Sequence, residues 1–345
     1  MRYELKEVTS WPRLSRSTLT DILLSIAYAL FVVAFPWEEI SRAGFTDFTQ
    51  YVDYFDYFLN KNDISFDEVY NLSADTSQLS ALKEYFTHEV IWFELVRRLS
   101  GMTGDVAMAL HIISFFILFV WGLYLFQRVN YALALLFLFN PFAIDVAMSG
   151  IRNGLAWSLV MLGLMTRSKA LRAALLLTGM FIHSATLVLV IFYYFTKVAS
   201  KFVERKTLLL SGLGIGVLVG LMLTVGNELV LGAIGDRRQG EDYLVGGGSF
   251  SQASLWGVLL YLQCISGRTY IRQNLFVIAV IAWYLTMNPF IPWSYRIWGA
   301  LLPIIATSAM NLSPRSRQVF VYLYAGYVGF QYLYWTKLFY YWSPA

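Results

Sequence analysis

Residues 149–195 constrain the fold most, because this stretch is almost entirely apolar and yet carries Arg152 near one end and His183 in its second half. A charged or titratable side chain at membrane depth costs roughly 2.5–3.5 kcal/mol on insertion scales, and such residues therefore face a bundle interior or a water-filled cavity. We expect both side chains to lie on the same, extracytoplasmic side and to mark a candidate active site.

The chain as a whole has the composition of an integral membrane protein. Of its 345 residues, 58% are hydrophobic and only 14% are charged, whereas about a quarter of the residues of soluble domains are charged. Its mean hydropathy is +0.56. The single cysteine, Cys264, excludes an intrachain disulfide and a cysteine-based metal cluster. Four basic residues before the first apolar run place the N-terminus in the cytoplasm.

The apolar runs predict an all-α polytopic bundle of about eleven membrane segments that forms a single domain over residues 1–345. We expect no internal repeat and no second domain. The predicted segments are residues 18–35, 106–126, 131–148, 149–165, 173–182, 185–196, 208–231, 255–265, 275–287, 297–310 and 319–335.

Two long polar segments are predicted to lie outside the cytoplasm. Residues 37–104 hold twelve acidic residues against five basic ones, and residues 232–254 form a glycine-rich loop. Within the first segment, DFTQYVDYFDYFL and HEVIWFELVRRLS have apolar residues at helical spacing. We therefore expect two amphipathic helices that lie on the membrane or cap the bundle, with Glu89 on a polar face.

The number of crossings depends on whether residues 173–195 form one span or two short arms. As one span of ordinary length, this stretch would put three later basic clusters on the outer face. If the chain instead reverses near His183, every later basic cluster falls in the cytoplasm. We favour the reversal. Each arm of about 12 residues reaches only about 18 Å, too short to cross the bilayer alone, so His183 would lie at the bottom of a cavity open to the outside.

Arginine residues collect on the predicted outer side. A guanidinium binds phosphate through two hydrogen bonds and stays charged at any accessible pH. A ring of arginines at the outer mouth of a bundle therefore predicts an anionic, lipid-attached substrate, for which pyrophosphate is the natural candidate. The residues are Arg42, Arg97, Arg98, Arg152, Arg237, Arg238 and Arg296, together with His183.

Five of these residues also have an ordinary structural interpretation. Arg152 fits an arginine that snorkels to the membrane interface, and Arg296 fits an interfacial anchor. Arg237 and Arg238 fit a solvated loop of mixed charge. His183 fits a structural histidine bonded to a backbone carbonyl at the chain break.

Other chemistries have little support in the sequence. No phosphate-binding P-loop and no dinucleotide glycine fingerprint is present, and no GxSxG elbow accompanies a serine nucleophile. The three histidines are widely spaced. We therefore expect no metal ion, no cofactor and no nucleic-acid partner.

At these residues the chain resembles the EpsG/Wzy-like family of bacterial O-antigen and exopolysaccharide polymerases. The most telling piece is a helix start, IRNGLA at residues 151–156, followed about thirty residues later by HSA at residues 183–185. Asn153 stands where the family often has Gln, and the family commonly has one residue between His and Ser. The other matching pieces are Arg42 with DFTQYVDYF, Glu89, Arg237/Arg238 with Tyr243, and Arg296.

The resemblance implies a GT-C-like membrane glycosyltransferase that joins undecaprenyl-pyrophosphate-linked oligosaccharide repeat units on the outer face of the bacterial cytoplasmic membrane. It also implies membrane-lipid contact and a chain-length regulator protein as a partner. We assign pyrophosphate binding to Arg152 and Arg296, with Arg237 or Arg238 closing over it. His183 activates or orients the acceptor hydroxyl, or binds phosphate. Arg42, Tyr243 and Glu89 complete the predicted substrate-binding residues.

Two alternatives remain open at this point. An O-antigen ligase uses the same donor with a lipid A-core acceptor. A transporter or flippase of lipid-linked sugars would need access from both sides and a charged cavity across the midplane. Charge found only toward the outer half favours the enzyme.

Overall fold

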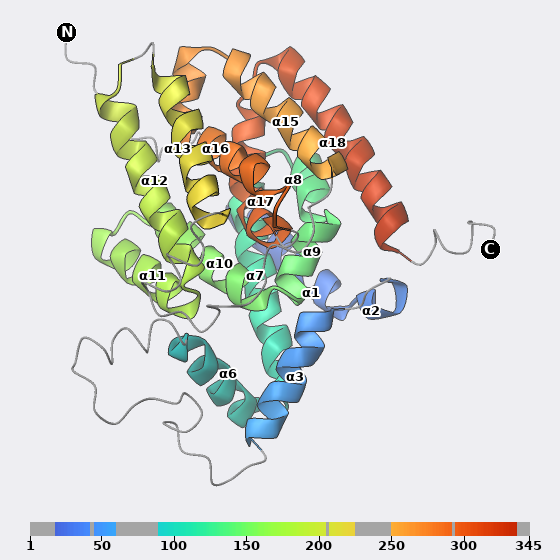
Figure 1. Ribbon diagram of the computed structural model, residues 1–345. Coiled ribbons are helices and arrows are strands. Elements are labelled where there is room, and N and C mark those ends of the chain that lie inside the picture. The colour runs from blue at the N-terminus through green and yellow to red at the C-terminus, as the bar shows by residue number, and fades with distance from the viewer. Residues whose placement is uncertain are drawn as a thin grey trace, which may run out of the picture.

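The computed structural model describes residues 18–41, 45–59, 89–204, 207–224, 250–291 and 294–336, and within these ranges the chain is mostly α-helical (Figure 1). A single antiparallel bridge joins Ser41 to Thr336. The helices are α1 (Thr18–Ala34), α2 (Trp37–Ile40), α3 (Thr46–Leu59), α6 (Val90–Thr103), α7 (Val106–Phe126), α8 (Tyr131–Leu138), α9 (Pro141–Met148), α10 (Ile151–Met165), α11 (Lys169–Ile182), α12 (Ala185–Phe202), α13 (Leu208–Thr224), α15 (Phe250–Ile265), α16 (Arg268–Met287), α17 (Ser294–Met310) and α18 (Pro314–Trp335).

The described helices include several that are long and apolar enough for a membrane. Helices α7, α12 and α16 qualify as spans by length and composition, and α8 with α9 qualifies as one bent span. Helix α7 occupies the centre of the bundle, where it contacts α1, α10, α17 and the amphipathic α6. The protein is therefore a multi-pass membrane protein, while the predicted total of eleven segments stays a prediction.

The two predicted amphipathic helices are confirmed as α3 and α6, which lie together at one end of the bundle (Figure 1). Aromatic rings join them: Tyr51 packs edge-on against Trp92, and Phe93 lies 5.4 Å from the ring centroid of Phe55. Two helices from the segment that was predicted as a long outer loop thus pack against α7.

The chain breaks at His183–Ser184, as predicted. Helix α11 runs back along α10, since Gly179 lies against Ala156 and Gly163 lies against the carbonyl of Arg172. Helix α12 then returns toward the far end of α10, because its C-terminal half lines the same cavity as Leu164. In Figure 1, α11 and α12 run in different directions. The second arm is longer than predicted: α12 has 18 residues and is itself a candidate span.

One predicted span is wrong in shape. Residues 131–148 form not one helix but α8 and α9, which meet at an angle of 60°. Pro141 has no amide hydrogen and cannot continue the preceding helix. Asn140 caps the second helix instead, since its side-chain oxygen accepts a hydrogen bond from the amide of Phe142 at 2.8 Å. Its amide nitrogen donates to the Tyr324 hydroxyl, also at 2.8 Å, which anchors the bend to α18.

Several helices begin before their apolar runs. Helix α15 begins at Phe250, so residues 250–254 of the predicted loop 232–254 are helical. Helix α16 begins at Arg268 and α18 at Pro314, which lie before the predicted starts at 275 and 319. Helix α17 begins at Ser294, so Arg296 lies in a helix and not in a loop. Apolar runs locate membrane depth, whereas helices extend past it through basic and polar residues.

Helices α13 and α16 pack closely through a stripe of glycines on α13. Gly212, Gly216 and Gly220 repeat every four residues and share one face. A Cβ atom on Gly216 would lie 2.2 Å from the carbonyl oxygen of Ala279, whereas a Cβ on Gly214 would meet nothing within 4 Å. Only a residue without a side chain permits this approach.

We expect Gly216→Ala to destabilise the protein by roughly 1–3 kcal/mol, the usual range for overpacking. The added methyl group must push α13 away from α16. Gly214→Ala is the matched control on the same helix, and it should be neutral or slightly stabilising because alanine is the better helix former. The melting temperatures of the two purified variants make the comparison. Equal melting temperatures would contradict the close packing of these helices.

Candidate active site

Glu89 lies at the centre of the candidate site. It immediately precedes α6 and has a left-handed backbone conformation, with φ 55° and ψ 42°. No other non-glycine residue among those described has a positive φ. Its side chain is only 3% exposed. A buried carboxylate in a strained backbone position persists only where the surrounding structure holds it, so the partners of this carboxylate define the site.

Both carboxylate oxygens of Glu89 have partners from distant segments. Arg152 Nη1 donates to Oε2 in an ion pair. His183 Nδ1 lies 2.6 Å from Oε1, and the backbone amide of Ser184 donates to the same oxygen at 3.3 Å. The side chains of Arg152 and His183 are 20% and 14% exposed. The carboxylate is thus shielded by the two residues that the sequence singled out, and both of these remain accessible.

Tyr51 of α3 also contacts the side chain of Arg152. Its hydroxyl accepts a hydrogen bond from Arg152 Nε at 2.9 Å, and its ring centroid lies 5.6 Å from the guanidinium carbon. Burial raises the pKa of the Tyr51 hydroxyl above its usual range, and the positive charge of Arg152 opposes that effect. Tyr51 therefore stays protonated at neutral pH and holds the guanidinium in one orientation.

Local sequence places these groups at the ends of helices. Arg152 lies in the first turn of α10, directly after the break at Ser149 and Gly150. His183 caps the C-terminus of α11 in an extended conformation, and Ser184 begins the turn into α12. Amides at a helix start add a positive field, so this end of α10 favours negative charge.

The predicted site residues divide into three groups. Arg152, His183 and Glu89 are brought together by direct contacts, although their roles stay predictions. Arg42, Arg237, Arg238 and Tyr243 lie outside the described residues. Arg296 lies on α17, and the position of its side chain is outside what the structure describes.

Two of the predicted outer arginines serve a different contact. Arg97 and Arg98 both pair with Glu94 on the exposed side of α6. Hydrogen bonds from Arg97 and then Arg98 lower the pKa of Glu94 to about 2. These arginines are therefore engaged in a surface ion-pair cluster rather than with Glu89.

Tyr51 was missed by sequence reasoning. Its signal was present, because DFTQYVDYF was predicted as an amphipathic helix, but helical spacing alone does not tell which of its aromatic residues meets Arg152. The substrate-binding role predicted for Glu89 stays a prediction, and the structure adds its contacts with Arg152 and His183.

Comparison with protein families matches residues 22–344, nearly the whole chain, to the EpsG family. No curated protein and no solved structure matches the chain. The matched range includes Tyr51, Glu89, Arg152 and His183, so the whole candidate site lies within it.

We expect Glu89→Gln to lower the free energy of unfolding by roughly 1.5–3 kcal/mol, as for the loss of hydrogen bonds to a charged group. The substitution leaves the Arg152 guanidinium without its carboxylate in a mostly buried position. Glu94→Gln is the matched control, because it makes the same change in an exposed ion pair and should cost less than about 1 kcal/mol. Denaturant unfolding followed by tryptophan fluorescence measures both. An equal effect of the two substitutions would contradict the central place of Glu89.

Proposed function

Because the chain belongs to the EpsG family, we propose that it is a polysaccharide polymerase that joins lipid-linked repeat units. The observation that carries the proposal is the pairing of Glu89 with both Arg152 and His183. This arrangement supplies a base for the attacking hydroxyl and a fixed cation for the leaving pyrophosphate at one accessible place. The proposed donor is an undecaprenyl-pyrophosphate-linked oligosaccharide.

Glu89 determines which nitrogen of His183 can act as a base. An ionised carboxylate only accepts hydrogen bonds, so the proton of a neutral imidazole must lie on Nδ1, which contacts Glu89 at 2.6 Å. The lone pair is then on Nε2. Carboxylate–histidine pairs fix tautomer and orientation in the same way in hydrolases and metal sites. In this proposal Glu89 is a positioning residue, and His183 is the general base.

The proposed reaction transfers the growing chain to a new unit. A hydroxyl oxygen on the non-reducing-end sugar of the new unit attacks the anomeric carbon through which the growing chain is bonded to its lipid pyrophosphate. The bond from that carbon to the pyrophosphate oxygen breaks, and the pyrophosphate keeps the electron pair. His183 Nε2 takes the proton of the attacking hydroxyl. A general base positioned in this way contributes typically 10²–10⁴-fold to the rate.

Arg152 has two functions in this scheme. It keeps Glu89 ionised, and its partly exposed guanidinium stabilises the charge that develops on the leaving pyrophosphate. The start of α10 adds backbone amides to the same field. Arg42, Arg237, Arg238, Tyr243 and Arg296 complete the proposed donor site.

The cellular setting is part of the same proposal. We place the protein in the bacterial cytoplasmic membrane, with the candidate site facing outward, as a GT-C-like enzyme. The basic residues at the other end of α10 and α12 support this orientation through the positive-inside rule. A chain-length regulator protein is the proposed partner.

We expect His183→Ala and His183→Gln to abolish the polymer ladder in a deletion strain, because neither side chain takes a proton at neutral pH. A gel of the surface polysaccharide should show a single capped repeat unit at wild-type protein levels. Glu94→Gln should keep the ladder. An intact ladder in both His183 variants would refute the assigned base, and loss of even the single-unit band would point to ligation or export.

We expect Arg152→Lys to reduce polymer yield at least about tenfold, although it keeps the positive charge. An ammonium group lacks the planar fork that contacts Glu89 and Tyr51 at the same time. Polymer yield and chain length on the same gel measure the effect, with immunoblotting as the control for protein level. Polymer of normal length and yield would show that charge alone suffices and that the fork is dispensable.

A further inference from the structure

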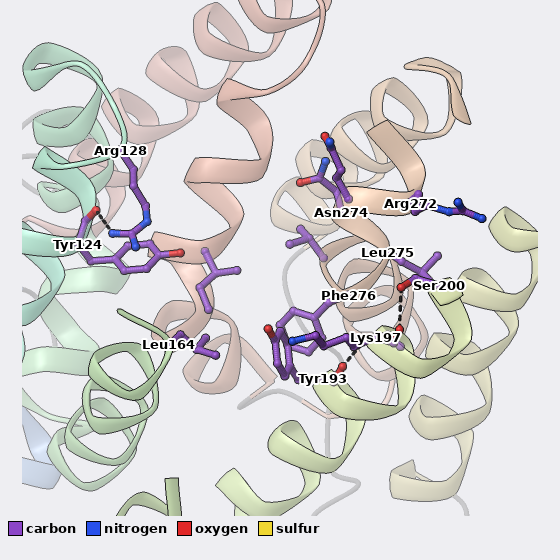
Figure 2. A pocket seen from close by; sticks show the side chains of 14 residues that line it. Tyr124, Arg128, Leu164, Tyr193, Lys197, Ser200, Arg272, Asn274, Leu275 and Phe276 are labelled. Carbon is purple, nitrogen blue, oxygen red and sulfur yellow. Dashed lines mark hydrogen bonds between the residues drawn. The ribbon is translucent and has the colours of Figure 1, made fainter. Parts of the chain in front are cut away.

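A cavity lined by apolar and basic side chains lies at the end of the bundle opposite Glu89 (Figure 2). Helix α10 connects the two places, since Arg152 lies at its start and Leu164 lines the cavity. At 1.5 Å per residue, these residues are roughly 18 Å apart along the helix axis. Helix α12 likewise begins beside Glu89 and brings Lys197 to the cavity. Nothing in the proposed polymerase reaction uses this place.

Two cations face the cavity from opposite sides. Arg128 follows α7, where its guanidinium carbon lies 4.1 Å from the ring centroid of Tyr124 and its Nη1 donates to the Tyr124 carbonyl at 3.2 Å. The Lys197 ammonium lies 5.9 Å from the ring centroid of Tyr193. Figure 2 shows these two residues across the cavity from each other, while the guanidinium of Arg272 points away. No acidic residue is among those that line the cavity. The site therefore favours an anion.

Asn274 provides a buried hydrogen-bond acceptor at the cavity. It lies at a kink within α16, with φ −116° and ψ 17°, and is only 1% exposed. Its amide nitrogen donates to the carbonyl of Tyr270 at 2.9 Å, which fixes the orientation of the amide. The other atom, Oδ1, is buried and accepts no hydrogen bond from the described residues. A ligand that fits this cavity thus carries a hydroxyl or similar donor besides its negative charge.

The remaining lining is mostly apolar. Leu164, Leu275, Phe276 and Ile304 come from three different helices and surround the polar groups. A cavity with cations, one buried acceptor and apolar walls matches an amphiphile better than a fully hydrophilic ion. In a multi-pass membrane protein, the adjacent amphiphile is the bilayer lipid itself.

We propose that this cavity binds a phosphate ester that carries a hydroxyl group, and that its source is the headgroup of a membrane lipid such as phosphatidylglycerol. Arg128 and Lys197 bind the phosphate, and the headgroup hydroxyl donates to Asn274 Oδ1. A soluble polyol phosphate offers the same chemistry without the acyl chains, so the two sources differ in their need for the apolar walls. The proposal is independent of the polymerase reaction.

The test is lipid binding by the purified full-length chain. Phosphatidylglycerol is titrated into the detergent-solubilised protein and bound lipid is counted by native mass spectrometry, with phosphatidylcholine as the comparison lipid and glycerol 3-phosphate as the soluble probe. The variants are Lys197→Gln, Arg128→Gln and the charge-conserving Lys197→Arg. Lys201→Gln is the matched control, because Lys201 lies one turn further along α12, is exposed, and is not among the lining residues.

We expect phosphatidylglycerol to bind more tightly than phosphatidylcholine, and each Gln substitution at Lys197 or Arg128 to weaken it about fivefold, the usual effect of one cation near a lipid phosphate. Lys197→Arg and Lys201→Gln should stay within about twofold of the wild type. If Lys201→Gln weakens binding as much as Lys197→Gln, the lipid is attracted by the surface charge in general, and the proposed site is wrong. If neither lipid nor glycerol 3-phosphate binds in a Lys197-dependent way, the proposal is overturned. Lys197-dependent binding of glycerol 3-phosphate alone would assign the site to a soluble phosphate.

Discussion

The rest of the candidate site depends on the carboxylate of Glu89. A buried carboxylate is stable only when its charge is compensated and its oxygens accept hydrogen bonds. Because its partners Arg152 and His183 belong to α10 and to the break between α11 and α12, a single side chain fixes the relative positions of segments that lie 63 and 94 residues away. The ion pairs of Glu94 connect no distant segments, because Arg97 and Arg98 lie on the same helix as Glu94.

The same carboxylate makes the chain break tolerable. Two helices that end within an apolar stretch leave backbone groups that need partners, and non-helical backbone at membrane depth occurs only where protein or a cavity provides them. The amide of Ser184 donates to Glu89 Oε1, and the amide of Thr186 donates to the carbonyl of His183 at 2.9 Å. The ionic cluster and the reversal of the chain are therefore one structural feature, and neither is expected to persist without the other.

The sequence predicted this feature in part. An arginine and a histidine within an apolar stretch, together with the distribution of later basic clusters, indicated both the reversal and the placement of Arg152 and His183 on the same side of the membrane. The contact with Glu89 depends on side-chain geometry across 63 residues or more, which apolar periodicity does not encode. The bend between α8 and α9 was missed although Asn140 and Pro141 signal it, because the surrounding apolar residues span a full membrane thickness. The starts of α11, α16 and α18 were placed too late, because basic residues precede the apolar run of each of these helices.

The packing between the two polar ends of the bundle bears on the choice between an enzyme and a transporter. Along α10, a Cβ atom on Gly154 would lie 3.1 Å from Ile117 of α7, and one on Gly179 of α11 would lie 2.8 Å from the carbonyl of Ala156. Helices α7, α10 and α11 are thus in close contact between the Glu89 cluster and the cavity of Arg128 and Lys197. A transporter alternates access to one site from both sides. Two chemically different polar sites, separated by tightly packed helices among the described residues, instead favour a catalytic site that is reached from one side only.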